Sequence, residues 1–285
     1  MTKKIKVLFY DIETSPLQAW VWGQGQQYVS HSQFVENYKM WDLISIQYCW
    51  NDGKKAKVLR YDKHGGTKGM IEAFDEIVKK ADITIGKNSN KFDSKMINSL
   101  RMLHKIKGFP EWTLIKDDLE VQMRRHFRLP SQSLDYISDL LGYGGKIKME
   151  MRDWIDIANY RQLMRFESNH KEVSKVLFSK SCREVLRDGK KALNKMCEYG
   201  AKDVVDTREL WNYLSEHFMP SYNMATHVGE RLACKQLGCG STNIIKNGTR
   251  LSAGQTMYQK FQCNDCGKYA GKAAILANGK YGKIC

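Results

Sequence analysis

Four acidic residues lie in three separated segments, each beside an apolar stretch that we expect to be buried. Asp11 and Glu13 stand in VLFYDIETSP, Asp93 in GKNSNKFDSKMI and Asp203 in MCEYGAKDVVDTREL. A lone carboxylate in such a place is costly to desolvate, and several gathered together repel one another unless a cation lies among them. Hard divalent cations prefer oxygen ligands. The sequence therefore predicts a fold that joins these segments around Mg²⁺ or Mn²⁺, and two such ions suit phosphodiester hydrolysis.

The order and wording of these segments resemble the DnaQ-like 3′–5′ exonucleases of the ribonuclease H-like superfamily. Three short motifs carry the resemblance: Asp-x-Glu on a strand, Asn-x-x-x-Phe-Asp, and Tyr-x-x-x-Asp, which marks the tyrosine (DEDDy) subclass. In this chain they are filled by Asp11 and Glu13, by Asn88 and Asp93, and by Tyr199 and Asp203.

The resemblance extends over residues 5–220 to exonucleases like the proofreading domain of family B polymerases, which are common in phage genomes. It is carried further by a Trp-rich stretch after DIETSP and by the segments LPSQSLDYISDLLG and GGKIKMEMRDW. The implied fold is an α/β, ribonuclease H-like mixed sheet flanked by helices. The implied domain comprises residues 1–225.

The resemblance also implies a role for each motif residue. Asp11 would bridge two Mg²⁺ or Mn²⁺ ions, Glu13 and Asp203 would complete the first, and Asp93 would hold the second mainly through water. Tyr199 would orient the attacking water rather than deprotonate it, because a phenol with a pKa near ~10 is a poor base at neutral pH.

Three further residues are expected to contact substrate. Asn88 braces the Asp93 loop or a phosphate. Trp22, with Trp20, either stacks on the 3′-terminal base or packs as an anchor at the sheet edge. Lys146 belongs to a Gly/Lys-rich turn that would meet the substrate.

Local patterns predict the elements that place these residues. Alternation and apolar runs predict strands at 5–12, 43–50 and 56–61, with a hairpin turn at Asn51-Asp52-Gly53. A helix is expected over 68–81, and a strand at 83–86 delivers Asn88 and Asp93 at its carboxyl end. A helix should follow over 93–105. Ser131 and Asp188 are possible starts of two later helices, the second carrying Tyr199 and Asp203 on one face.

Charge favours a polyanionic partner. The 285 residues include 46 Lys or Arg against 31 Asp or Glu, a formal net charge of +15. Nucleic acid is the commonest partner of such a protein, although the charge can serve solubility alone. The run MRRHFRL has two open interpretations, a track for a phosphate strand or a solvated face. No segment approaches the ~20 apolar residues of a membrane span, so we expect no membrane partner and a cytoplasmic location, in the host cytoplasm if the chain is phage-encoded.

Four of the eight cysteines have the spacing of a zinc site. Cys234 and Cys239 are separated by 23 residues from Cys263 and Cys266, two close pairs at a β-hairpin distance. The segment resembles zinc ribbons found beside transposase domains, which implies one structural Zn²⁺ and a domain at 226–285. Its eight basic residues and single acid over 234–285 favour nucleic acid over protein as its partner, with protein docking left open. Phe261 should fill the small core.

These observations predict a metal-dependent exonuclease that releases nucleoside 5′-monophosphates from single-stranded DNA or unpaired 3′ ends. The expected setting is phage or mobile-element DNA replication, recombination or repair, with replication or recombination proteins as possible partners. Three alternatives stay open: the same chemistry on RNA, a structure-specific endonuclease, and a non-catalytic binding or recruitment protein that acts through the zinc ribbon.

Overall fold

The computed structural model describes most of the chain: residues 5–23, 25–34, 40–109, 114–143, 147–165, 181–218, 223, 232–236 and 239–285. The first part alternates strands and helices, in the order β1 (Val7–Thr14), η1 (His31–Gln33), β2 (Leu43–Trp50), β3 (Lys57–Arg60), α1 (Gly66–Val78), β4 (Ile83–Gly86), α2 (Asp93–Leu103), β5 (Ile115–Asp118), α3 (Leu119–His126), α4 (Leu134–Leu140), α5 (Met151–Arg165) and α7 (Cys182–Leu214). Three strands follow near the C-terminus: β6 (Ile244–Leu251), β7 (Met257–Cys263) and β8 (Tyr269–Ala274).

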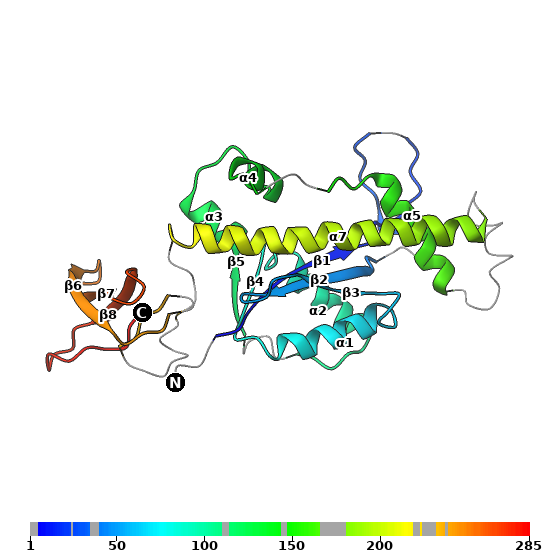
Figure 1. Ribbon diagram of the computed structural model, residues 1–285. Helices are drawn as coiled ribbons and strands as arrows, with labels where there is room; N and C mark the ends of the chain where they lie inside the picture. Colours follow the sequence, from blue (N-terminus) through cyan, green and yellow to red (C-terminus); the bar gives the residue numbers. More distant parts are fainter. Residues whose placement is uncertain are drawn as a thin grey trace.

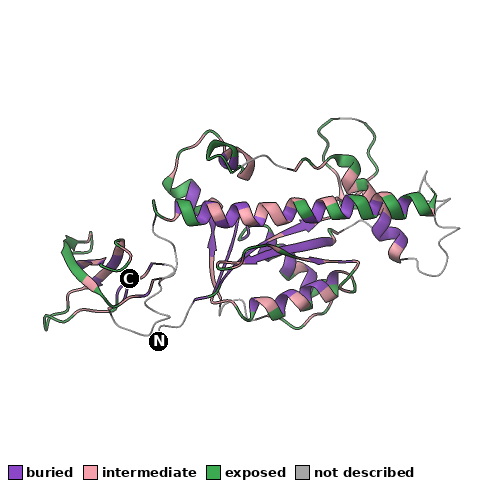
Figure 2. Ribbon diagram, in the orientation of Figure 1, coloured by how far each residue is buried: buried purple, intermediate pink, exposed green. Residues whose placement is uncertain are grey.

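The strands of this first part form a mixed five-stranded sheet in the order β3-β2-β1-β4-β5 (Figure 1). β2 runs antiparallel to both β1 and β3, whereas β4 runs parallel to β1 and to β5. The predicted α/β mixed sheet is therefore confirmed. β1 lies at its centre and is buried along most of its length, as Figure 2 shows.

Helices cover both faces of this sheet. In Figure 1, α7 runs along one side of the strands, and α1 and α2 lie on the other. Alternate side chains of β1 pack into two hydrophobic cores, one on each face of the sheet. Val7 and Phe9 pack with Val204 and Trp211 of α7. Leu8 points to the opposite face and packs with residues of α1 and α2. Asp11 and Glu13 continue the Val7–Phe9 alternation, so they lie on the α7 face.

Several predicted bounds shift. The strands at 43–50 and 83–86 are confirmed, the strand expected at 5–12 begins at Val7 and extends to Thr14, and the strand expected at 56–61 is shortened to Lys57–Arg60. The expected turn at 51–53 closes with a hydrogen bond from the Gly53 N–H to the Trp50 carbonyl, 3.0 Å. The helix expected over 68–81 begins two residues earlier and ends at Val78, and the helix expected over 93–105 ends at Leu103.

Both proposed helix starts are wrong. α4 is capped by Ser133, whose hydroxyl accepts from the Tyr136 N–H, and not by Ser131. α7 begins at Cys182 behind Ser181, which forms a capping box with Glu184, so Asp188 lies inside a 33-residue helix. A reciprocal Ser–Glu capping box satisfies two backbone N–H groups at once and therefore outcompetes an isolated Asp further on.

A second, smaller sheet holds the C-terminal segment, with the antiparallel order β6-β7-β8. Its core contains Phe261, as predicted, together with small residues and two cysteines. Most of β6 is exposed, and the segment is far less buried than the large sheet (Figure 2). The predicted domain boundary between 225 and 226 lies outside the described residues. No helix within the described ranges is long and apolar enough to span a bilayer.

Candidate active site and candidate metal centre

Asp11 and Glu13 lie two positions apart on the central strand, with Ile12 between them, and so point to the same face of the sheet. Their antiparallel neighbours on β2 are Gln47 and Ser45. β4 pairs with β1 only from Val7 to Phe9 and stops at Gly86. The part of β1 that carries the two acids therefore extends beyond the end of β4, and a loop can reach it there.

Asp93, the first residue of α2, closes that edge of β1. Its carboxylate accepts a hydrogen bond from the backbone N–H of Ile12, 2.9 Å away, between the two acids of the first motif. The Ser94 hydroxyl lies 2.9 Å from that of Tyr10, a second link between α2 and β1. The N-cap residue of α2 is Phe92, which makes no side-chain capping hydrogen bond. The second motif is thus fixed to the first by hydrogen bonds that local helix capping does not explain.

Asp203 and Tyr199 reach the same face from α7. They stand four residues apart, one turn of helix, and their side chains are hydrogen-bonded to each other. Between them Gly200 faces β2 so closely that a Cβ there would lie 2.5 Å from the Gln47 side chain. The absence of a side chain at Gly200 therefore lets α7 approach the strand that runs beside Asp11.

Electrostatics shows that the four acids share one environment. The pKa of Asp11 is raised well above its usual value by burial and then by the charges of Asp93, Glu13 and Asp203, while Lys87 lowers it. These four carboxylates, Asp11, Glu13, Asp93 and Asp203, are called the acid cluster below.

Asp93 has a similarly perturbed carboxyl group. Burial raises its pKa to about 7, although hydrogen bonds from its own N–H and that of Ile12 oppose the rise, and the Asp118 charge adds to it. Without a cation, ionising the whole acid cluster is therefore unfavourable near neutral pH.

The donor set fits a hard divalent cation. The acid cluster offers carboxylate oxygens in a partly buried place, and the buried Oε1 of Gln47, opposite Asp11, has no hydrogen-bond partner within the described residues. Lys87, the nearby cation, is already bound to Glu120 at 2.9 Å. The carboxylate oxygens of the acid cluster are nevertheless more widely spaced than the ligand atoms of a site that encloses a single ion. In the described part of the chain, only four cysteines place three or more ligand atoms within 4.8 Å of one another.

Tyr199 is held neutral. Burial raises its pKa, and the charges of Asp203, Glu13 and Asp11 raise it further, as does the hydrogen bond to Asp203. A phenol in this state donates a hydrogen bond but does not accept a proton as a base at neutral pH.

The loop that carries Asn88 and Asp93 depends on a residue that the sequence patterns did not reveal. Asp118, at the end of β5, accepts from the N–H groups of Asn88 and Asn90, each at 2.9 Å, and caps α3 through the N–H of Glu120. Asn88 itself has a φ of +60°. Its predicted bracing role is consistent with its carbonyl, which accepts from the N–H groups of Lys91 and Phe92. The available signal was the Asp117-Asp118 doublet after the apolar pair Leu114-Ile115.

The other residues predicted to contact substrate are Trp22, with its neighbour Trp20, and Lys146. Trp22 is fully exposed and Trp20 is 77 % exposed, so the alternative in which these rings pack as an anchor is wrong. Lys146 lies outside the described residues.

Four cysteines form a second constellation, the thiol cluster (Cys234, Cys239, Cys263 and Cys266), whose Sγ atoms all lie within 4.8 Å of one another. The Cys234–Cys266 and Cys239–Cys263 sulfur pairs are 3.8 and 3.6 Å apart. These distances are too long for disulfides and close to the about 3.8 Å between thiolates that bind a tetrahedral Zn²⁺ at 2.3 Å. Burial raises the pKa of Cys239 to about 11, so a bound cation would be needed to hold that thiol deprotonated.

Backbone turns set this spacing. Cys263 ends β7, and its carbonyl accepts from the N–H of Gly267, which has a φ of +70° and closes the turn that presents Cys266. Opposite, the Cys234 N–H donates to the Ser241 carbonyl at 2.7 Å. Asp265 joins the two turns through hydrogen bonds to Ser241 and Asn243.

Comparison with known proteins adds a structural likeness. No protein-family model matches this chain, and no curated protein matches it. Among solved structures, the chain is similar to the family B DNA polymerase from the hyperthermophilic archaeon Pyrobaculum calidifontis, with 14 % identity and a TM-score of 0.40. The match covers 90 % of this chain and 32 % of the polymerase, so the chain spans about a third of that protein's length.

Proposed function

We propose that this chain is a metal-dependent 3′–5′ exonuclease that hydrolyses single-stranded DNA or unpaired 3′ ends to nucleoside 5′-monophosphates. One observation carries the proposal: the Asp93 carboxylate binds the Ile12 N–H between Asp11 and Glu13, while Asp203 perturbs the pKa of Asp11. Four carboxylates from three distant segments converge, and a purely structural network of like charges would be destabilising.

Asp11, Glu13, Asp93 and Asp203 would hold two Mg²⁺ or Mn²⁺ ions. When bound, such ions stabilise negative charge on phosphate oxygens and lower the pKa of water. Their presence would also explain how carboxyl groups with raised pKa values work in the ionised form near neutral pH.

The protein itself supplies position. Tyr199 stays protonated and is held by Asp203, so its hydroxyl can orient a water or a phosphate oxygen but cannot serve as the general base. Asp118 keeps the loop from Asn88 to Asp93 in place. Asn88 and the exposed ring of Trp22 would contact the strand, the second by stacking on its terminal base. Lys146 is assigned to substrate binding through the resemblance alone.

The reaction is a hydrolysis at the last phosphodiester. The oxygen of a water forms a bond to phosphorus, and the bond from phosphorus to the 3′ oxygen of the preceding nucleotide breaks. That oxygen takes up a proton to become the new 3′-hydroxyl, and the terminal nucleotide leaves with a 5′-phosphate. No oxidant or further reactant is needed.

The C-terminal segment would be a zinc ribbon in a domain of residues 226–285, with one Zn²⁺ on the thiol cluster. Sulfur spacing supports this assignment. Three outward residues of its sheet, Lys260, Lys272 and Tyr258, form a basic and aromatic face, with the Lys272 ammonium 4.3 Å from the Tyr258 ring centre. Such a face suits nucleic acid.

The direct test is digestion of 5′-labelled oligomers on a denaturing gel, with Mg²⁺, Mn²⁺ or EDTA. Wild type is compared with Asp11→Ala and with Glu198→Gln, a change of an exposed acid on α7 next to Tyr199. We expect a ladder that shortens from the 3′ end with metal only, absent in Asp11→Ala and unchanged in Glu198→Gln.

Three further results would redirect the proposal. Digestion of RNA but not DNA would assign the same chemistry to a ribonuclease. Cleavage of a strand whose 3′ end is blocked would indicate an endonuclease. If neither strand is cut while binding persists, the chain acts through binding and the exonuclease proposal is wrong.

A further inference from the structure

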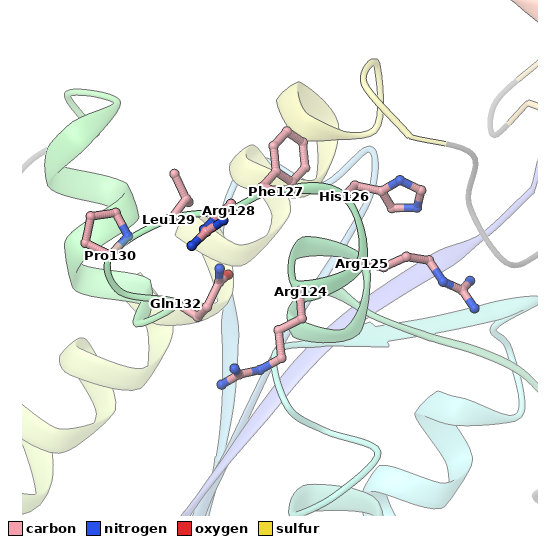
Figure 3. Close-up of a pocket in the computed structure, with 8 residues that line it drawn as sticks. All are labelled: Arg124, Arg125, His126, Phe127, Arg128, Leu129, Pro130 and Gln132. Atoms are coloured by element: carbon pink, nitrogen blue, oxygen red, sulfur yellow. The ribbon is translucent and has the colours of Figure 1, made fainter.

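A basic groove lies where α3 ends, outside the acid cluster. It encloses about 730 Å³, and its lining includes Arg124, Arg128 and Gln132, with Phe127 and Pro130 as apolar walls. In Figure 3, Arg124, Arg128 and Gln132 lie on one side of the last turn of α3, whereas Arg125 and His126 extend to the other. We call this feature the arginine groove.

Within the described residues, its charge is only partly neutralised. Arg124 binds Glu120 at 2.7 Å, but Arg125 and Arg128 form no ion pair with any described residue, and all three arginines are exposed. An exposed arginine without a partner is available for a phosphate, which its planar guanidinium can bind in a bidentate manner.

The groove rests on a packed platform. His126 stacks on Phe218, with ring centres 5.6 Å apart, and Phe127 meets His217 and Phe218 edge-on. Phe218 in turn packs against the fully buried Trp211 of α7. The end of α3 is thereby fixed to the end of α7, so the arginines project from a held position.

A row of three side chains leads from the groove toward the acid cluster. Glu120 binds Lys87 through one carboxylate oxygen and Arg124 through the other. Lys87 directly follows Gly86, the last residue of β4, and directly precedes Asn88 in the loop that carries Asp93. Two positive charges, joined by the Glu120 carboxylate, therefore lie between that loop and the groove.

The length of this path matches a few nucleotides. α3 rises about 9 Å over the six residues from Glu120 to His126, and the acid cluster lies beyond Glu120, on the Lys87 side of the row. A stacked strand advances about 3.4 Å per nucleotide, so a strand whose end lies at the acid cluster would place a phosphate about three or more nucleotides back at the arginines.

We propose that the arginine groove binds the phosphate backbone of the nucleic-acid strand, three or more nucleotides to the 5′ side of the end that reaches the acid cluster. The proposal rests on the proposed function, because the acid cluster fixes which end of the strand lies there. It predicts that affinity depends on strand length.

The experiment measures binding without hydrolysis. Fluorescence anisotropy, without added divalent cations and without chelator, follows binding of labelled DNA oligomers of 3, 8 and 20 nucleotides at several salt concentrations. The double variant Arg124→Gln/Arg128→Gln is compared with wild type and with Arg183→Gln, an exposed arginine in the first turn of α7, at its opposite end. All three arginines are exposed, so these changes should not affect folding.

We expect the double variant to weaken binding of the 20-mer about tenfold and to reduce the slope of log K against log salt by about 1.4, the loss of two phosphate contacts on a single strand. The 3-mer should bind wild type and variant alike, because it does not reach the groove. Arg183→Gln should match wild type throughout.

Unchanged affinity and slope for the 20-mer in the double variant would overturn the proposal. An equal loss of affinity for the 3-mer in the double variant would also overturn it. If the double variant instead lost binding selectively to a polyglutamate peptide, the proposal would be overturned and the groove would be assigned to an acidic protein. The result is separate from the proposed function. A wild type that digests strands but shows no groove effect refutes only the groove, whereas groove-dependent binding without digestion refutes only the exonuclease.

Discussion

The two candidate metal sites of this chain are supported in opposite ways. The acid cluster is gathered around a central strand between two hydrophobic cores, and its surroundings are held by hydrogen bonds that Ile12 and Tyr199 donate and Asp118 accepts. The thiol cluster lies in a short segment whose buried core consists of a few small residues, Phe261 and Ile284, and two of the cysteines themselves. The folded sheet alone is expected to form the first site, whereas metal binding at the second is expected to stabilise the fold around it.

This difference separates what each metal should do. Removing an ion from the acid cluster should stop chemistry and leave the sheet folded. Removing an ion from the thiol cluster should unfold the C-terminal segment and leave the sheet folded as well.

The largest expected effect concerns the thiol cluster. Cys263→Ser, or removal of zinc by a strong chelator, should abolish the protection of amides in 239–285 against hydrogen exchange, because structural zinc contributes on the order of 10 kcal/mol to such small domains. Amides of β1, β2 and α7 should keep their protection. Cys285→Ser, at an exposed thiol outside the cluster, is the matched control. Persistent protection of β7 without metal would contradict the comparison.

The second prediction concerns catalysis. Asp203→Asn keeps the shape of the side chain but removes a charge from the acid cluster, and we expect hydrolysis to fall by about 10³-fold or more. The midpoint of thermal unfolding should stay the same or rise, because one of four mutually repelling carboxylates is gone. Glu198→Gln on the same helix should retain full activity. If the Asp203→Asn protein retained more than a tenth of wild-type activity, Asp203 would not belong to the catalytic site.

The third prediction tests the loop that carries Asp93. A Cβ at Gly86 would lie 2.5 Å from the Ser89 Cβ and 3.0 Å from the Tyr10 carbonyl oxygen. Gly86→Ala should therefore destabilise the protein by about 1–3 kcal/mol and lower activity by moving the loop. Gly108→Ala, where a Cβ meets nothing within 4 Å, should do neither. Denaturant unfolding of the two variants gives the comparison, and equal stabilities would show that the loop is not tightly packed.

The fourth prediction is a pH dependence. Without divalent cations Asp93 has a pKa of about 7 in the folded protein against 3.8 ordinarily. Between these values the unfolded chain releases a proton that the folded protein retains, so the Asp93 contribution to stability is lost as pH rises through this window. Bound Mn²⁺ favours the ionised form. Mn²⁺ should thus raise the unfolding midpoint more at pH 8 than at pH 5, by the equivalent of about 1–2 kcal/mol.

Asp93→Asn is the control for this effect. The variant carries no ionisable group at that position, so the difference between pH 5 and pH 8 should shrink. A Mn²⁺ effect of the same size at both pH values in wild type would contradict the raised pKa values of the acid cluster.

The sequence predicted the sheet, the gathering of the motif residues and the four-cysteine spacing, because each leaves a local pattern. The strands that carry or precede the acids are continuous apolar runs, and two close cysteine pairs at this spacing are typical of a metal site. What it missed depends on contacts distant in sequence. Asp118 acts on backbone groups of Asn88 and Asn90, thirty and twenty-eight residues away.

Two errors have physical causes. An Asp before a Gly-Lys-Lys run resembles a helix cap, which favours Asp188 as the start of α7, yet the capping box of Ser181 with Glu184 begins about two turns earlier. Packing was one alternative for Trp20 and Trp22, and hydrophobicity alone could not tell that both rings remain exposed. A row such as Lys87, Glu120 and Arg124 is also invisible in sequence, since two different elements supply it.

Manganese binding measured by electron paramagnetic resonance tests most directly whether the acid cluster is a divalent-cation site. Mn²⁺ is titrated into wild type, Asp11→Asn, Glu198→Gln and Cys263→Ser, with zinc content recorded in parallel. We predict that Asp11→Asn loses Mn²⁺ binding and keeps its zinc, while Cys263→Ser keeps Mn²⁺ binding and loses zinc. Undiminished Mn²⁺ binding by Asp11→Asn would contradict the assignment.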